Sequence, residues 1–278
     1  MGRPRPKSFV PCGFRCLDPD FKVSTRVYEH RETPTPVSNA VHSSPSSVRE
    51  TLVVIPAKNE SGTIGKIVGQ VLSNGLSVVV VDDASTDATA EVARAAGATV
   101  MRLVNPLGAW GATQTGIRYA LKHGFKQVVT LDADGQHPVE LIPELLAPVI
   151  SGQSDVTIGS CVGRGSPLRK VAWFMFRKTG GLKVADLTSG FRCYNARGIR
   201  LLSAREATLI DYQDIGVLFL LLEAGLRIQE VEITMCARLS GHSRIFNTWL
   251  AVGKYMMLST VLAVSKNLYR QNMGHGRK

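Results

Sequence analysis

VVTLDADGQHP, residues 128–138, is an apolar run that ends abruptly in two carboxylates. The run predicts a buried strand over 127–131. Because alternate side chains of a strand share a face, Asp132 and Asp134 would project to the same side. Two like charges held that close repel each other unless a cation lies between them, and a hard divalent cation that also binds phosphates fits this need. The alternative is an Asp-Gly turn in which both carboxylates are only solvated.

Outward from this stretch, short apolar runs alternate with segments of helical periodicity. Strands are expected over residues 52–56, 77–81, 98–104, 127–131, 155–159 and 228–235, and helices over 61–73, 87–96, 111–123, 138–150 and 210–224. This alternation predicts an α/β fold with a mostly parallel sheet and helices on both faces.

Polar clusters follow three of the expected strands, at residues 57–60, 82–85 and 132–134. Ligands of such sheets bind at the carboxyl ends of the strands, so the three clusters predict one shared crevice. The glycine-rich turn of dinucleotide-binding folds and the P-loop lysine motif are both absent from the sequence. A bound nucleotide would therefore meet side-chain carboxylates such as Glu60 and Asp83, which can accept hydrogen bonds from a base or a ribose.

Four motifs occur in a fixed order: VIPAKNE (54–60), VDDASTD (81–87), LDADGQH (131–137) and DLTSGFR (186–192). Together they resemble family-2 glycosyltransferases, most of all the dolichyl-phosphate mannosyltransferase and polyprenyl-phosphate glycosyltransferase branch. The resemblance covers about residues 51–244. It implies a GT-A fold with a Rossmann-like sheet, an enzyme, and a nucleotide-diphosphate sugar as the donor.

The resemblance also implies roles for individual residues. The nucleotide-sugar site would comprise Pro56, Ala57, Asn59, Glu60, Asp83, Asp132 and Ala133. The cofactor, Mg²⁺ or Mn²⁺, and the donor diphosphate would be held by Asp132, Asp134 and Gln136, and Asp186 would border the sugar. The acceptor phosphate is expected among Arg164, Arg169, Arg177, Arg192, Arg238, Ser243 and Arg244.

Three positions depart from the family pattern or qualify it. Ala84 stands where a glycine is usual, which makes that turn less permissive. Cys161 stands where an arginine is expected, so the acceptor-phosphate contact would move to Arg164 or Arg169. His137 is interpreted as shaping the turn rather than binding the metal, because oxygen ligands suit Mg²⁺ better.

The implied reaction is an inverting transfer to a polyprenyl-phosphate carrier. A lipid phosphate is already anionic and needs little general-base help, so positioning by arginine matters more. A saccharide hydroxyl, the first alternative acceptor, would need a carboxylate base, for which Asp214 is the best candidate and Asp186 the second. Nucleotidyl transfer, with pyrophosphate as the product, is the alternative from another enzyme class.

Composition indicates which partners to expect. The net charge of +11 favours phosphorylated substrates or an anionic membrane surface, and the sparse aromatic content argues against nucleic acid. Residues 1–49 predict a disordered appendage without a secretory signal, and 51–244 a catalytic domain. Residues 245–278 predict an apolar helix with a basic tail, which either lies on the bilayer or docks on protein. We expect a cytoplasmic enzyme, peripherally bound to the membrane, with a possible membrane partner protein.

Overall fold

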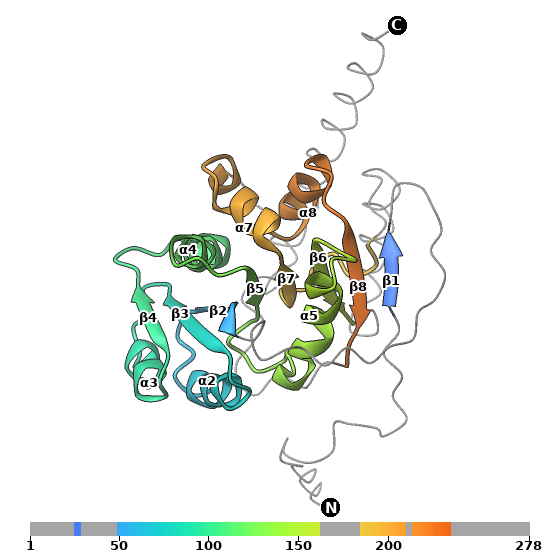
Figure 1. Ribbon diagram of the computed structural model, residues 1–278. Helices are drawn as coiled ribbons and strands as arrows, with labels where there is room; N and C mark the ends of the chain where they lie inside the picture. The colour runs from blue at the N-terminus through green and yellow to red at the C-terminus, as the bar shows by residue number, and fades with distance from the viewer. Residues whose placement is uncertain (1–24, 29–48, 162–183, 210–212, 235–278) are drawn as a thin grey trace, which may run out of the picture.

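The computed structural model describes residues 25–28, 49–161, 184–209 and 213–234, which form a sheet with helices on both sides (Figure 1). Along the chain the elements are β1 (Thr25–Tyr28), β2 (Thr51–Ala57), α2 (Ile64–Ser73), β3 (Ser77–Asp82), α3 (Thr89–Ala95), β4 (Thr99–Arg102), α4 (Gly108–Lys122), β5 (Gln127–Thr130), η1 (Val139–Leu141), α5 (Ile142–Ile150), β6 (Val156–Ser160), β7 (Arg192–Tyr194), α7 (Ala196–Ser203), η3 (Glu206–Leu209), α8 (Gln213–Glu223) and β8 (Ile228–Glu232). The expected alternation of strands and helices is confirmed.

The described strands form a mostly parallel sheet in the order β1-β8-β6-β7-β5-β2-β3-β4. Strand β2 pairs in parallel with both β3 and β5, and β3 pairs in parallel with β4. Strand β7 runs antiparallel to its neighbours β5 and β6, while β6 and β8 are parallel. The carboxyl ends of β2, β3 and β5 therefore meet at one edge, as the polar clusters in the sequence predict.

The two faces of the sheet carry separate hydrophobic cores. Helices α4, α7 and α8 cover one face, and α2, α3 and α5 cover the other (Figure 1). Along β2, Leu52 and Val54 point into the first core, and Val53 and Ile55 point into the second. Burial on both faces explains why the central strands read as continuous apolar runs rather than as alternating ones.

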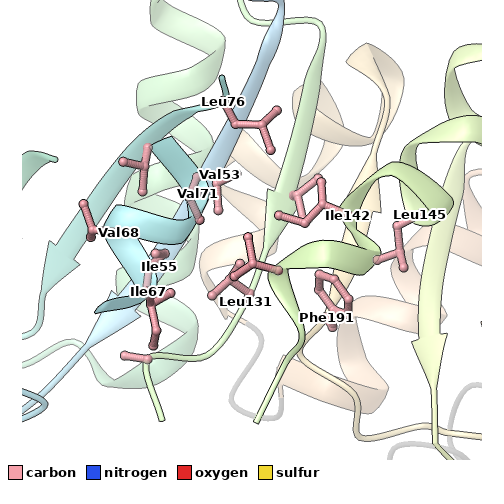
Figure 2. Close-up of a cluster of buried hydrophobic side chains, with 14 of the residues drawn as sticks. Val53, Ile55, Ile67, Val68, Val71, Leu76, Leu131, Ile142, Leu145 and Phe191 are labelled. Carbon is pink, nitrogen blue, oxygen red and sulfur yellow. The ribbon is translucent and has the colours of Figure 1, made fainter. Parts of the chain in front are cut away.

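The second core holds the residues that flank the acidic edge of the sheet. Leu131 and Phe191 pack there with Ile142 and Leu145, and all four side chains are at most 1% exposed (Figure 2). Leu131 immediately precedes Asp132, and Phe191 belongs to the DLTSGFR motif. Packing of these neighbours therefore fixes two motifs that are far apart in the sequence beside each other.

Several details differ from the sequence-based expectations. Strand β7 and helix α7 were not predicted, and α4 begins at Gly108 rather than at residue 111. Within the segment 1–49, expected to be disordered, Thr25–Tyr28 forms strand β1, which pairs antiparallel with β8. The helix expected near the C-terminus lies outside the described residues.

Candidate active site

The loops that follow β2 and β3 are bonded to each other. Asn59 adopts a φ of +53°, its backbone N–H donates to Ser85 Oγ at 2.9 Å, and its Oδ1 accepts from the backbone N–H of Thr86 at 2.8 Å. The backbone N–H of Glu60 donates to Thr89 Oγ1 at 2.8 Å. The side chain of Asn59, predicted to line the nucleotide site, therefore also holds the second loop in place.

The carboxylate of Asp83 is buried and fixes the start of α4. It accepts hydrogen bonds from the backbone N–H groups of Leu107 at 2.6 Å and Gly108 at 3.1 Å, and Lys58 Nζ lies 3.8 Å from its Oδ2. Asp82 is also buried and accepts from the backbone N–H of Ser85 at 3.1 Å. Both carboxylates of this motif thus organise the rim of the site.

The two central carboxylates lie beyond the end of their strand. Because β5 ends at Thr130, the expected alternation along a strand does not apply to Asp132 and Asp134, and the turn that contains Gly135 (φ +76°) places them instead. The Asp134 carboxylate is largely buried and accepts from the backbone N–H of Gln136 at 3.0 Å. The side chain of Asp132 is half exposed.

The DLTSGFR motif forms a buried turn beside Asp132. The carboxylate of Asp186 accepts from the backbone N–H groups of Thr188 at 3.1 Å and Cys161 at 3.2 Å. Glu230 of β8, a residue that the sequence did not single out, accepts from the backbone N–H groups of Ala185 and Asp186 at 2.9 Å each. Through these hydrogen bonds, Asp186 and Glu230 stabilise the turn.

Arg192 also stabilises this turn. Its guanidinium donates to the carbonyl oxygens of Ser189 at 2.7 Å and Leu187 at 3.3 Å, and the residue is 4% exposed. Arg192 was predicted to bind the acceptor phosphate, and part of its hydrogen-bonding capacity is used inside the protein.

A pocket opens between the edge of the sheet and the start of α4. It is lined by Pro56, Ala109, Trp110, Thr113, Thr130, Leu131, Asp132, Gly190, Arg192 and Tyr194. The indole N–H of Trp110 donates to the carbonyl oxygen of Ala207 at 2.7 Å, which fixes the ring at the wall. Trp110, Thr113 and Tyr194 were not predicted, because no motif links them to the acidic residues along the chain.

Most predicted acceptor residues are not among the described residues. Outside the described residues lie Arg164, Arg169, Arg177, Arg238, Ser243 and Arg244. Asp214 lies in the first turn of α8, and its side chain is also outside what the structure describes. Of the residues predicted from the sequence, the structure places Asp132, Asp186 and Arg192, the last expected to bind the acceptor phosphate, around one turn.

The residues at the edge of the sheet offer hard oxygen atoms to a metal. Within the described part of the chain, no group of three or more His, Cys, Asp and Glu side chains is arranged to hold an ion. Mg²⁺ needs no such protein cage, because it is commonly bound through one or two carboxylates, water and substrate phosphates. The carboxylates of Asp132 and Asp134 fit that mode of binding.

In the same described residues, no helix is both long and apolar enough to cross a bilayer.

Comparison with known proteins identifies relatives of the whole domain. The family described as glycosyl transferase family 2 matches residues 52–206. An undecaprenyl-phosphate mannosyltransferase of Micrococcus luteus is 32% identical over 213 residues, which cover 70% of this chain and 86% of that protein. A polyprenol monophosphomannose synthase of Mycolicibacterium smegmatis is 30% identical over 224 residues, which cover 72% of this chain and 84% of that protein.

A solved structure supports the fold. Glucosyl-3-phosphoglycerate synthase from Mycobacterium tuberculosis, in complex with Mn²⁺, UDP-glucose and phosphoglyceric acid, superposes with a TM-score of 0.58. The alignment is 21% identical and covers 78% of this chain and 80% of that one. This likeness confirms the expected GT-A fold.

Proposed function

Because this chain belongs to glycosyl transferase family 2 and is a glycosyltransferase, we propose that it transfers a sugar from a nucleotide-diphosphate sugar to a polyprenyl-phosphate carrier. The observation that carries the proposal is the match to two relatives named for polyprenyl-phosphate substrates, over more than four fifths of the length of each. Membership of this family argues against the nucleotidyltransferase alternative.

The donor would bind at the carboxyl ends of β2, β3 and β5. Pro56 and Asp132 line the described pocket there, and the neighbouring Ala57, Glu60 and Ala133 belong to the same edge. The rigid bonding between the loops after β2 and β3 supports this role, because a preformed site loses less entropy on binding.

Asp132, Asp134 and Gln136 would hold Mg²⁺ or Mn²⁺ with the donor diphosphate. When bound, the ion neutralises charge on the leaving nucleoside diphosphate, and such assistance is worth several kcal/mol. The half-exposed carboxylate of Asp132 supports this assignment, since Asp132 lines the pocket and its side chain is accessible to a ligand.

The acceptor oxygen would attack the sugar from the face opposite the leaving group, with inversion. A lipid phosphate arrives already ionised, so the chain needs to position it rather than to remove a proton. Asp186 is poorly suited to act as a base, because both of its carboxylate oxygens accept hydrogen bonds from the protein. Asp214 is the remaining carboxylate candidate if the acceptor is a hydroxyl.

Peripheral binding to the cytoplasmic face of a membrane would bring the enzyme to such an acceptor. The net charge of +11 supports attraction to anionic lipid head groups. The basic residues predicted to contact the acceptor phosphate add to the same charge, and a membrane partner protein remains part of the proposal.

The test is incubation of the full chain with labelled nucleotide sugars, polyprenyl phosphate in vesicles, and Mg²⁺ or Mn²⁺. We expect label in the organic phase, and its loss in Asp132→Asn. Glu50→Gln is the matched control, because it removes a surface carboxylate that pairs with Lys126 at the opposite end of β2 from the site. Label found only in water-soluble glycan would reject the lipid-phosphate acceptor.

A further inference from the structure

We propose that His137 is a positioning residue, which holds the backbone of Asp132 so that the carboxylate lies in the orientation that receives the metal–diphosphate. The inference rests on the metal-binding part of the proposed function. It assigns to His137 a task beyond shaping the turn in which it lies.

The imidazole ring contacts the main chain and faces the side chain of the same aspartate. The backbone N–H of Asp132 donates to His137 Nδ1 at 3.0 Å. A ring nitrogen that accepts a hydrogen bond carries no proton, so the neutral ring carries its proton on Nε2. His137 Nε2 lies 3.7 Å from Asp132 Oδ2, which is longer than a hydrogen bond, so the ring is bonded to the backbone of Asp132 and is only a close neighbour of the carboxylate.

The ring itself is held rigidly. The side chain of His137 is 0% exposed, whereas that of Asp132 is 51% exposed. The imidazole stacks on Phe191, with ring centroids 5.2 Å apart and planes inclined by 15°. Phe191 is fully buried in the second core (Figure 2). A buried group that stacks on the core thus lies behind an exposed ligand, which is the arrangement by which partners behind a metal ligand orient it.

The turn has other sources of stability. The backbone N–H of Gln136 donates to Asp134 Oδ1 at 3.0 Å, and Thr63 Oγ1 donates to the carbonyl oxygen of Ala133 at 2.6 Å. These bonds close the turn and tie it to Thr63, the residue before α2, so the turn has supports besides His137. The contact with Asp132 is therefore better explained by orientation of the ligand.

Two substitutions separate orientation from packing. His137→Phe retains an aromatic ring that stacks on Phe191 but removes the acceptor. His137→Asn places its Oδ1 near the position of Nδ1 and can still accept from the Asp132 N–H. His123→Phe is the matched control, because His123 also lies against an aromatic ring, that of Tyr119 at 4.1 Å, but at the far end of α4.

The measurement is Mn²⁺ binding to the full chain in the presence of UDP or, separately, GDP, followed by the electron paramagnetic resonance of free Mn²⁺. We expect His137→Phe to weaken Mn²⁺ affinity by about 10- to 100-fold, the usual effect of removing a partner behind a ligand. His137→Asn is expected to remain closer to the wild-type affinity, and His123→Phe to equal it.

Equal affinity in His137→Phe and the wild type would overturn the inference while leaving the proposed function intact. An Asn variant as weak as the Phe variant would also overturn it. Absence of Mn²⁺ binding by the wild-type chain would instead reject metal binding in the proposed function, and the inference with it. If His137→Phe does not fold, His137→Gln replaces it, since its amide lies at the Nε2 end, and an affinity equal to that of His137→Asn would then refute the role of Nδ1.

Discussion

Gly190→Ala is expected to weaken metal binding while leaving the fold nearly unchanged. A Cβ atom at residue 190 would lie 2.8 Å from Asp132 Oδ1 and 3.1 Å from Asp132 Oδ2. The backbone of Gly190 cannot retreat easily, because its carbonyl oxygen accepts a hydrogen bond from Thr130 Oγ1 at 2.7 Å. The half-exposed carboxylate of Asp132 is the part that can move, so the substitution acts on the proposed metal ligand.

The expected loss of Mn²⁺ affinity follows from the cost of moving the Asp132 carboxylate. Forcing a side chain about 30° from its rotamer costs about 0.5–1.5 kcal/mol. If binding the metal beside the added methyl group requires Asp132 to adopt an orientation strained by that amount, Mn²⁺ affinity falls by about twofold to tenfold, since about 1.4 kcal/mol corresponds to a factor of ten. The thermal midpoint should change little, because the carboxylate moves into solvent rather than into the core.

Calorimetric titration with Mn²⁺ in the presence of UDP or GDP, and a thermal melt of the same protein, measure the two effects. Gly69→Ala is the control: nothing lies within 4 Å of its added Cβ, and it should stabilise the exposed face of α2 by up to about 1 kcal/mol. Unchanged Mn²⁺ affinity in Gly190→Ala would refute the reasoning. If the melting temperature also fell sharply, the backbone rather than Asp132 would have moved.

Substitutions at three further positions test the fold. Gly116→Ala places a Cβ 2.3 Å from Val54 Cγ1 at the contact of α4 with β2, and should lower the free energy of unfolding in denaturant melts by about 1–3 kcal/mol. Ala84 has a φ of +54°, so Ala84→Val should destabilise by more than about 1 kcal/mol in thermal melts, whereas Ala84→Gly should not destabilise. Burial of the Asp155 carboxylate acts to raise its pKa, but hydrogen bonds, first among them those from Arg227, outweigh burial and lower the pKa. A carboxyl with a lowered pKa stabilises the fold above its ordinary range and loses that contribution as the pH falls, so the stability lost in Asp155→Asn at neutral pH should vanish in acid.

The sequence predicted the elements that have a recognisable local pattern of residues. Strands β2, β3 and β5 are continuous apolar runs rich in valine, and burial on both faces is what such runs indicate. Strand β7 spans only Arg192–Tyr194, and it exists because β5 and β6 pair with it from either side. No local pattern marks such a strand. Helix α7 was detectable, since Asn195 caps it through the backbone N–H groups of Arg197 and Gly198.

The sequence indicated where several candidate site residues lie, but not which groups they contact. The ends of the predicted strands placed Asp83 and Asp132 at one edge of the sheet, whereas Asp186 was indicated only by the family resemblance. The motifs did not show that Asp83 would bind the backbone at Leu107 or that Glu230 would hold the turn at Asp186, since these partners are 24 and 44 residues away along the chain. Hydrogen bonds across such separations depend on loop geometry that residue types do not specify.

Burial divides the acidic residues at this edge into two groups with different consequences. Asp83, Asp186 and Glu230 are buried and accept backbone N–H groups, so removing any of them leaves donors unsatisfied in a water-poor interior, which costs about 1–3 kcal/mol for each unsatisfied group. Asp132 is half exposed, and within the described residues no backbone N–H donates to its carboxylate. Loss of activity on substitution of a buried member therefore reports on the architecture of the rim as much as on chemistry. Asp132 is the position at which loss of activity without loss of stability can be attributed to the reaction itself.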